Sequence, residues 1–337
     1  MGDADRLTFA SARSLSLATL TAAFNRGFEG YLIPIGQTPD SLLRMLREND
    51  VREDESLAAL APDGAPVGVA LLGRRGARAW VAGMGVAPEW RGQGQGAALL
   101  ARLLDRAREL GVQRVTLEVL EDNTPASRLY ERMGFQETRP LTIYTGHASL
   151  SPTAAWRAIT VAQQAPNADV ASVAATPPNS GPVTLPAALP DSPAPRRIAV
   201  SRALAIFDAL HSFAPSWQRE QATLAHMATR LTALALVTAG APGASAASPA
   251  SRQTGIQAYM LTSRQPRGYT IMDVGSTGAT PRERLCDTLT LLRALLAKQS
   301  DALLRAINAP QGDPLGDALD ALGCPVVAHQ REMALTL

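Results

Sequence analysis

One glycine-rich segment has the residue types of an anion-binding loop. Residues 84–96 read Met-Gly-Val-Ala-Pro-Glu-Trp-Arg-Gly-Gln-Gly-Gln-Gly and lead directly into a helical pattern over 97–110. Glycines let a backbone approach a ligand closely, and successive amide groups at the start of a helix attract anions, helped by the helix dipole. Arg91 adds a cation whose donors suit phosphate oxygens. The segment therefore predicts a pyrophosphate site.

The same glycines also fit the weaker form of a dinucleotide fingerprint, Gly-x-Gly-x-x-Ala, at Gly92, Gly94 and Ala97. Two features disfavour a nicotinamide-dependent enzyme. A Rossmann loop follows its strand at once, whereas Pro88 and Arg91 intervene here. In addition, two helices and a hairpin precede the loop where a Rossmann unit would begin.

A second segment, residues 117–135, places a tyrosine after a predicted strand and turn. It reads Leu-Glu-Val-Leu-Glu-Asp-Asn-Thr-Pro-Ala-Ser-Arg-Leu-Tyr-Glu-Arg-Met-Gly-Phe. Together the two segments resemble the GCN5-related N-acetyltransferase (GNAT) superfamily. The first matches its Arg/Gln-x-x-Gly-x-Gly/Ala loop, and the second matches its Asn-x-x-Ala-x-x-x-Tyr segment followed by Gly-Phe. The resemblance covers about residues 5–145.

The resemblance implies acetyl-CoA as co-substrate and assigns its contacts residue by residue. The pyrophosphate would lie on the amides of residues 92–97, beside Arg91. The pantetheine arm would pair with the backbone of residues 84–86, Asn123 would bind it, and Tyr130 would lie near the thioester sulfur. The implied cofactor-binding residues are Met84, Gly85, Val86, Arg91, Gly92, Gln93, Gly94, Gln95, Gly96, Ala97, Asn123 and Tyr130.

The implied reaction needs a neutral amine and a protonated leaving thiol. At pH 7, deprotonation costs about 1.4 kcal/mol for an α-amine and roughly 4.6 kcal/mol for a lysine-like amine. A base or a water chain therefore helps the attack, and an acid helps the thiolate leave. Tyr130 is the candidate acid; the alternative is that this tyrosine only packs in the core. Glu118 is the candidate base. It stands twelve residues before Tyr130, the spacing found in relatives that resemble ribosomal-protein alanine acetyltransferases. The alternative is a glutamate that faces solvent or pairs with an arginine.

The acceptor residues are expected between the first two helices, where the family usually builds its acceptor pocket. Phe28, Glu29 and Tyr31 lie there, and Glu29 either holds a substrate amine or is an ordinary charge at the end of a helix. We expect direct attack on the thioester, with no covalent enzyme intermediate and no metal.

The amino-acid composition excludes several other classes of protein. The chain has 337 residues, a net charge of +2 and 46% hydrophobic residues, enough for two ordinary domains without a nucleic-acid or membrane footprint. Lys298 is the only lysine, and its context excludes a P-loop. Two cysteines and four histidines form no zinc pattern, so two separate thiols are expected. Without an apolar run of about 18 residues or a signal sequence, we expect a cytoplasmic protein.

The pattern predicts two α/β units joined by a linker. Residues 1–150 form the catalytic GNAT domain, with strands near 6–10, 56–61, 67–73, 79–86, 114–120 and 138–144 and helices near 17–30, 40–46, 97–110 and 125–133. Residues 151–195 form a Pro/Ala-rich linker. Residues 196–337 look like the first unit again: helices near 202–212, 223–234, 282–298 and 314–322, strands near 235–239, 257–262 and 268–274. The resemblance implies the α/β GNAT fold, a mixed central sheet flanked by helices, and the internal match predicts that it is present twice in tandem.

The second copy lacks the residues that carry chemistry. Ile307, Gly312 and Leu319 stand opposite Glu118, Asn123 and Tyr130, and residues 275–282 lack the glycine spacing and contain Pro281, which withholds an amide. We therefore predict a degenerate GNAT-like domain that closes the acceptor cleft, covers a sheet edge or dimerises. The predicted function is acetylation of a small-molecule amine or a protein N-terminus. The alternative is an acyl-CoA-binding regulatory protein without turnover.

Overall fold

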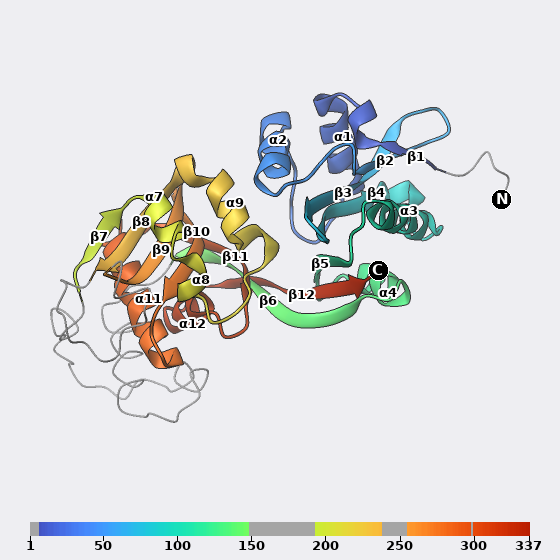
Figure 1. The fold of residues 1–337 in the computed structure, drawn as a ribbon. Helices are drawn as coiled ribbons and strands as arrows, with labels where there is room; N and C mark the ends of the chain where they lie inside the picture. The colour runs from blue at the N-terminus through green and yellow to red at the C-terminus, as the bar shows by residue number, and fades with distance from the viewer. Residues whose placement is uncertain (1–6, 148–192, 238–254, 298) are drawn as a thin grey trace. The chain divides into compact units, whose positions relative to one another are not determined.

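The computed structural model describes residues 7–147, 193–237, 255–297 and 299–337. The chain divides into two compact units, Met1–Pro140 with Gln330–Leu337, and Leu141–His329 (Figure 1). The predicted ranges 1–150 and 196–337 therefore differ from these units, most of all because the last eight residues belong to the first unit. Most of the predicted linker 151–195, and Lys298, lie outside the described residues.

The first unit follows the predicted order of elements closely. Its elements are β1 (Thr8–Ser11), α1 (Leu17–Gly27), α2 (Pro39–Glu48), β2 (Leu57–Leu60), β3 (Pro66–Arg75), β4 (Arg78–Val86), α3 (Gln95–Glu109), β5 (Arg114–Leu120), α4 (Thr124–Arg132), the start of β6 (Gln136–His147) and the end of β12 (Val326–Thr336). The sheet order is β1-β2-β3-β4-β5-β12. Among these described strands only β4 and β5 pair in parallel, so the sheet is mixed rather than doubly wound.

Alternating side chains divide the strands of the first unit between two layers of helix. On one face, Leu117 and Val119 of β5 pack with Leu99 and Leu103 of α3 in an apolar core. On the other face, α1 contacts β3 and β4. A β-bulge in β4 between Val81 and Gly83 reverses the alternation, so Val81 joins the core while Gly83 lies against Phe24 of α1.

The C-terminal strand completes the sheet of the first unit. Residues 330–336 of β12 pair antiparallel with β5 in continuous register, from Gln330 opposite Leu120 to Thr336 opposite Arg114 (Figure 1). Met333 is buried in the core. No sequence pattern predicted this strand, because its centre, His-Gln-Arg-Glu, is polar.

The second unit repeats the architecture. Its elements are the end of β6, β7 (Pro195–Ile198), α7 (Val200–Leu204), α8 (Phe207–Leu210), α9 (Gln221–His226), β8 (Leu231–Val237), β9 (Ile256–Gln265), β10 (Gly268–Ser276), α11 (Pro281–Leu296), β11 (Leu303–Pro310), α12 (Pro314–Ala321) and the start of β12. The sheet order is β6-β11-β10-β9-β8-β7, with β10 and β11 parallel. A bulge in β10 between Ile271 and Asp273 matches the bulge of β4.

Several predicted elements of the second half were wrong. The predicted helix 202–212 is two short helices, and the predicted helix 223–234 ends at His226 because Leu231–Val237 forms β8 instead. Leu231, Ala233 and Ala235 face one core while Leu236 faces the other, so both faces of this strand are apolar and its residue types do not alternate between polar and apolar. Strand β11 was not predicted.

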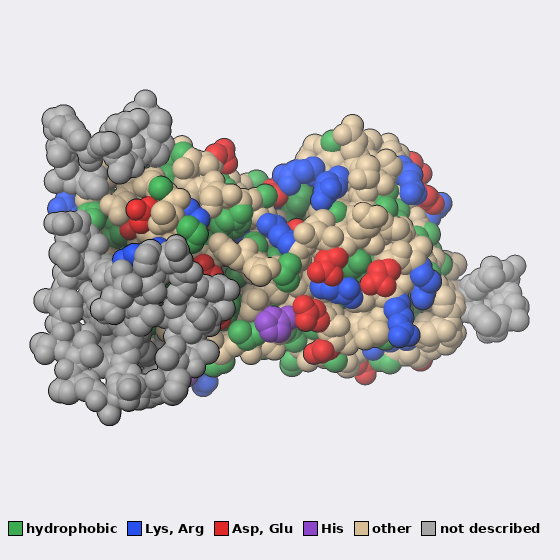
Figure 2. Space-filling model, turned by 90° about the horizontal axis from the view of Figure 1, so that it is seen from below, with side chains coloured by type: hydrophobic (Ala, Val, Ile, Leu, Met, Phe, Trp, Pro, Cys, Tyr) green, Lys and Arg blue, Asp and Glu red, His purple; other side chains and the backbone are tan. Residues whose placement is uncertain are grey.

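The surface and the thiols agree with the composition. On the face seen in Figure 2, Arg and acidic side chains are interspersed rather than segregated. Cys286 and Cys324 are both free thiols. Among the helices that the structure describes, none has the length and apolarity needed to cross a membrane.

Candidate functional site

The predicted anion loop ends at a helix whose first amides have no side-chain cap. Gly92 and Gly94 both have left-handed backbones, with φ of 73° and 79°, and Gly94 is the N-cap residue of α3. No side chain caps α3, whereas α1, α2 and α4 each have one. The amides of the first turn, which includes Gly96 and Ala97, therefore have no intrahelical acceptor. This helix end can bind an anion through its backbone.

Two glutamines and the arginine of the loop are engaged within the protein. Arg91 donates from Nε to the Val86 carbonyl at 2.9 Å and from Nη2 to the Glu29 carbonyl at 2.7 Å. Gln93 donates to the Glu89 carbonyl, and Gln95, which is buried, accepts from the Leu7 amide. These donors fix the loop against the end of α1 and β4, and the place of Arg91 beside the pyrophosphate stays a prediction. The amides of Gly92 to Ala97 remain the predicted phosphate ligands.

The glycines of β4 are required by packing within the protein. A Cβ on Gly85 would lie 2.4 Å from the carbonyl oxygen of Gly27, and one on Gly68 would lie 2.5 Å from that of Gly85. A Cβ on Gly83 would lie 3.2 Å from the Phe24 ring. These glycines therefore allow helix α1 to pack closely on strands β3 and β4.

The other edge of β4 diverges from its neighbour. The parallel ladder between β4 and β5 runs from Arg78 opposite Arg114 to Trp80 opposite Thr116 and ends there. Met84, Gly85 and Val86 pair with β3 on their other side. An extended ligand can therefore add to the backbone of residues 84–86 as a strand would.

Three predicted site residues converge beside this divergence. Asn123 is the N-cap of α4 and accepts from the Ala126 amide at 3.3 Å. Burial raises the pKa of Tyr31, and a hydrogen bond from Asn123 opposes that rise. Tyr130 is 7% exposed and packs edge-on against Phe135, and burial together with the neighbouring Tyr31 raises the pKa of Tyr130 well above its ordinary value. At neutral pH the Tyr130 hydroxyl is protonated and can donate.

The expected acceptor residues separate into two groups. Phe28 is half-buried, stacks at 4.6 Å on Phe24 and contacts Tyr31 edge-on at 5.4 Å. Phe28 therefore forms an aromatic wall with Tyr31. Glu29 instead forms a surface ion pair with Arg26, and its side chain is 55% exposed. Its carboxylate behaves as a charge at the end of a helix.

Glu118 is held by a residue that sequence reasoning missed. The buried Trp80 indole donates from Nε1 to Glu118 Oε2 at 2.6 Å. Because side chains alternate along β5, Glu118 leaves the sheet on the face opposite Leu117 and Val119, whose core includes Tyr130. Glu118 and Tyr130 therefore approach the diverging strands from different sides.

The C-terminal strand adds a second carboxylate to the face of Glu118. Glu332 of β12 is the cross-strand partner of Glu118, so both side chains lie on one face. Arg139 binds Glu332 with two hydrogen bonds of 2.8 and 2.9 Å. No short-range sequence signal indicates this pair, because it depends on pairing between strands about 200 residues apart.

The equivalent loop of the second unit is organised differently. Thr280 and Glu283 form a capping box at the start of α11, where Pro281 removes one amide. The N-cap of α12 is Asp313, so the structural counterpart of Asn123 is Asp313 rather than Gly312. Leu319 does replace Tyr130: the Cys324 amide donates to the Leu319 carbonyl as the Phe135 amide does to that of Tyr130.

Buried charges bridge the diverging strands of the second unit. Arg219, which is 2% exposed, donates to the Met272 carbonyl in the bulge of β10 and forms an ion pair with Asp313 at the start of α12. Asp273 accepts from Tyr259 at 2.7 Å and contacts His211 at 3.1 Å. Side chains of the unit itself therefore lie where residues 84–86 of the first unit have an unpaired edge.

Comparisons with known proteins agree with this architecture. Residues 20–135 match the acetyltransferase (GNAT) family model. A GCN5-related N-acetyltransferase from Sphaerobacter thermophilus is 13% identical, with a TM-score of 0.61, over 100% of this chain and 96% of its own.

Two further solved structures have the same fold over nearly the whole chain. A tandem GNAT protein from the clavulanic acid biosynthesis pathway is 14% identical, with a TM-score of 0.62 over 98% of both chains. A GCN5-related N-acetyltransferase from Kribbella flavida is 16% identical, with a TM-score of 0.56, over 99% of this chain and 72% of its own. At this identity the likeness concerns the fold. The predicted tandem fold is confirmed, and residues 20–135 match the GNAT family.

Proposed function

We propose that the chain is an acetyl-CoA-dependent N-acetyltransferase that acetylates a primary amine, with the first unit carrying the reaction. The main support is that this unit combines two features: helix α3 has no side-chain cap at its start, and the ladder between β4 and β5 ends before residues 84–86. A tyrosine held protonated by burial, Tyr130, lies close by. The match of residues 20–135 to the GNAT family supports acetyl transfer, and the choice of the first unit rests on these residues.

The residues of the first unit fit the chemical parts of acetyl-CoA. The amides of residues 92–97 suit a pyrophosphate, because they combine left-handed glycines with a helix N-terminus. Residues 84–86 lie beyond the end of the β4–β5 ladder, where Arg91 donates to the Val86 carbonyl. This edge suits an extended arm that contains amides, and Asn123 can hydrogen-bond it. Bound acetyl-CoA would supply the acetyl group as an activated thioester.

The protein's own groups would manage two protons. Glu118, oriented by Trp80, would accept the proton of the attacking amine directly or through water. Tyr130, whose buried phenol is protonated at neutral pH, would donate a hydrogen bond to the departing sulfur. The two groups serve different atoms, which agrees with their approach from different faces of the sheet.

The second unit is proposed not to bind acetyl-CoA. Its α11 amides are capped by Thr280, and Arg219 and Asp313 form a buried ion pair across its diverging strands. Displacing that pair would leave a buried charge unpartnered, which typically costs 3–5 kcal/mol. A Cβ on Gly275 would lie 2.8 Å from the Tyr259 ring, so side chains already pack there.

Thermal unfolding with acetyl-CoA, CoA, NAD and NADP tests the cofactor. Ligand at a hundred times its Kd stabilises a binding protein by about 2.7 kcal/mol. Acetyl-CoA and CoA should raise the unfolding temperature, and Gly94→Glu should reduce the rise. No shift with either CoA form, or a shift with NAD instead, would contradict the proposal.

Release of free thiol then separates the enzyme from its alternative, an acyl-CoA-binding regulatory protein. A panel of primary amines and peptides with free N-termini should include acceptors that speed thiol release by the wild type. Stabilisation by acetyl-CoA without release, across the whole panel, would favour the regulatory protein.

A further inference from the structure

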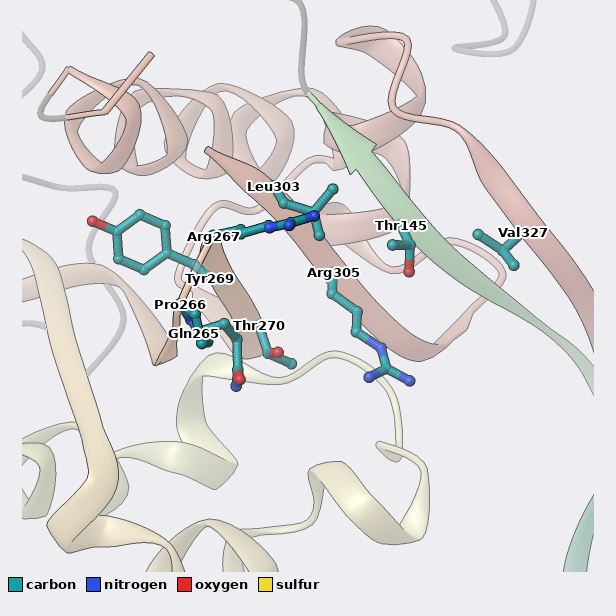
Figure 3. A pocket seen from close by; sticks show the side chains of 9 residues that line it. All are labelled: Thr145, Gln265, Pro266, Arg267, Tyr269, Thr270, Leu303, Arg305 and Val327. Atoms are coloured by element: carbon teal, nitrogen blue, oxygen red, sulfur yellow. The ribbon is translucent and has the colours of Figure 1, made fainter. Parts of the chain in front are cut away.

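A cavity of about 570 Å³ lies on the sheet of the second unit (Figure 3). Its walls come from the turn between β9 and β10 and from β10, β11, β6 and β12. All of its lining residues belong to the second unit. Its volume falls within the range of small-molecule sites, roughly 300–1,000 Å³.

Strand register places a polar row across the floor of this cavity. Thr270 of β10 pairs with Arg305 of β11, and Arg305 pairs in turn with Thr145 of β6. Partners in a ladder share one face of the sheet, about 5 Å apart. Leu304 and Tyr144, which alternate with this row, lie in the core beneath α11. The row therefore faces the cavity, with a guanidinium between two threonines.

The charge of the cavity is entirely positive. Arg305 and Arg267 both line it, no lining residue is acidic, and neither arginine has a carboxylate partner among the described residues. In Figure 3 the Arg305 side chain extends clear of the sheet, while Arg267 lies along Leu303. Guanidinium groups bind carboxylates and phosphates with paired hydrogen bonds, so the cavity favours an anion.

Apolar side chains lie beside the two cations. Val327 and Leu303 both line the cavity. Val327 is 49% exposed, and within the described ranges it is one of three exposed large hydrophobic residues. A ligand that covered Val327 would remove apolar surface from water. An inorganic anion would leave that surface exposed.

We propose that this cavity binds a small organic anion. Arg305 and Arg267 hold its carboxylate or phosphate, Thr270 offers a further hydroxyl donor, and an apolar body packs on Val327 and Leu303. The site is independent of the proposed acetyl transfer, because it uses different residues in the other unit.

Titration calorimetry on the full chain tests the site with three probes of similar shape: benzoate, phenyl phosphate and the neutral benzamide. At least one anion should bind with a Kd below a few millimolar, and benzamide should bind at least tenfold more weakly. The anion that binds more tightly identifies the head group. Binding should weaken at 0.5 M salt, because charged contacts are screened.

Two matched variants localise the binding. Arg305→Gln should raise the Kd at least tenfold, whereas Arg197→Gln, the same charge change on the exposed strand β7, should leave it unchanged. If Arg305→Gln lowers the unfolding temperature, Arg267→Gln in the turn replaces it. The proposal is overturned if neither anion binds, if benzamide binds equally, or if the Arg197 variant weakens binding as much. Displacement of the probe by CoA would assign it to the cofactor site and also overturn the proposal.

Discussion

Two glycines with left-handed backbones flank α3, and substituting each of them tests the predicted anion site at the start of this helix. Gly94 at the start and Gly111 after the end have φ of 79° and 72°, and nothing lies within 4 Å of a Cβ built on either. Glutamate at either position should therefore cost about 1–2 kcal/mol in left-handed strain. The two substitutions add the same charge, so only their position along the helix differs.

The helix dipole and the predicted anion site act on these variants in opposite ways. A carboxylate stabilises a helix start and destabilises a helix end by about 0.3–1 kcal/mol each. Gly111→Glu should therefore unfold at the lower temperature. At Gly94 the carboxylate lies beside the predicted pyrophosphate, where repulsion of about 1–3 kcal/mol should weaken binding of acetyl-CoA roughly 5- to 150-fold.

Distance protects the cofactor site from the Gly111 substitution. Helix α3 has 15 residues, so its ends are about 22 Å apart, more than twice the screening length of about 8 Å at physiological salt. Calorimetric titration with acetyl-CoA and thermal unfolding measure both effects. Equal losses of affinity in the two variants would refute an anion site at the start of α3, whatever their stabilities.

Four further outcomes follow from the site and the fold. Tyr130→Phe should lower kcat for thiol release at least tenfold while leaving the Kd of acetyl-CoA within twofold; equal activity would assign Tyr130 to packing. Trp80→Phe should move the acidic limb of the pH–rate profile, because it removes the indole donor that Trp80 Nε1 supplies to Glu118 Oε2; an unmoved profile would show that Glu118 is not the base. Deleting residues 330–337 should abolish stabilisation by acetyl-CoA, because β5 loses its partner strand; a retained thermal shift would show that the first unit forms its site without β12. Although burial alone would lower the pKa of His211, its carboxylate partner raises it, so the stabilising pair is fully present below about pH 6.5 and lost at higher pH. Unfolding temperature should then fall more steeply above pH 6.5 in the wild type than in His211→Gln, and parallel curves would contradict this.

Local patterns were sufficient for most of the first unit. Strand β5 occupies the predicted residues 114–120, and α3 begins two residues before its predicted start. Both elements have strong local signals: apolar and polar residues alternate in β5, and Gly111 ends α3 in a left-handed turn. The second helix starts earlier than predicted because Thr38 caps it and Pro39 occupies its first turn.

The missed features depend on contacts between distant residues. The pairing of β12 with β5 joins residues more than 200 positions apart, and neither strand contains a local signal of its partner. Trp80 and Glu332 were missed for the same reason, because their significance comes from lying beside Glu118. Arg91 matched a motif, yet the carbonyl groups around it lie on α1 and β4 and decide where its donors go.

The bulges of β4 and β10 connect the two halves in physical terms. Each bulge comes just after the parallel ladder ends, so each unit has backbone groups that must find partners as two strands diverge. In the second unit Arg219 satisfies the Met272 carbonyl in the bulge and bridges to Asp313. In the first unit Arg91 donates to the Val86 carbonyl and to the Glu29 carbonyl, and among the described residues no ion pair joins the edge of residues 84–86 to the start of α4. A bound ligand should therefore stabilise the first unit and leave the second, already closed by its own side chains, nearly unchanged.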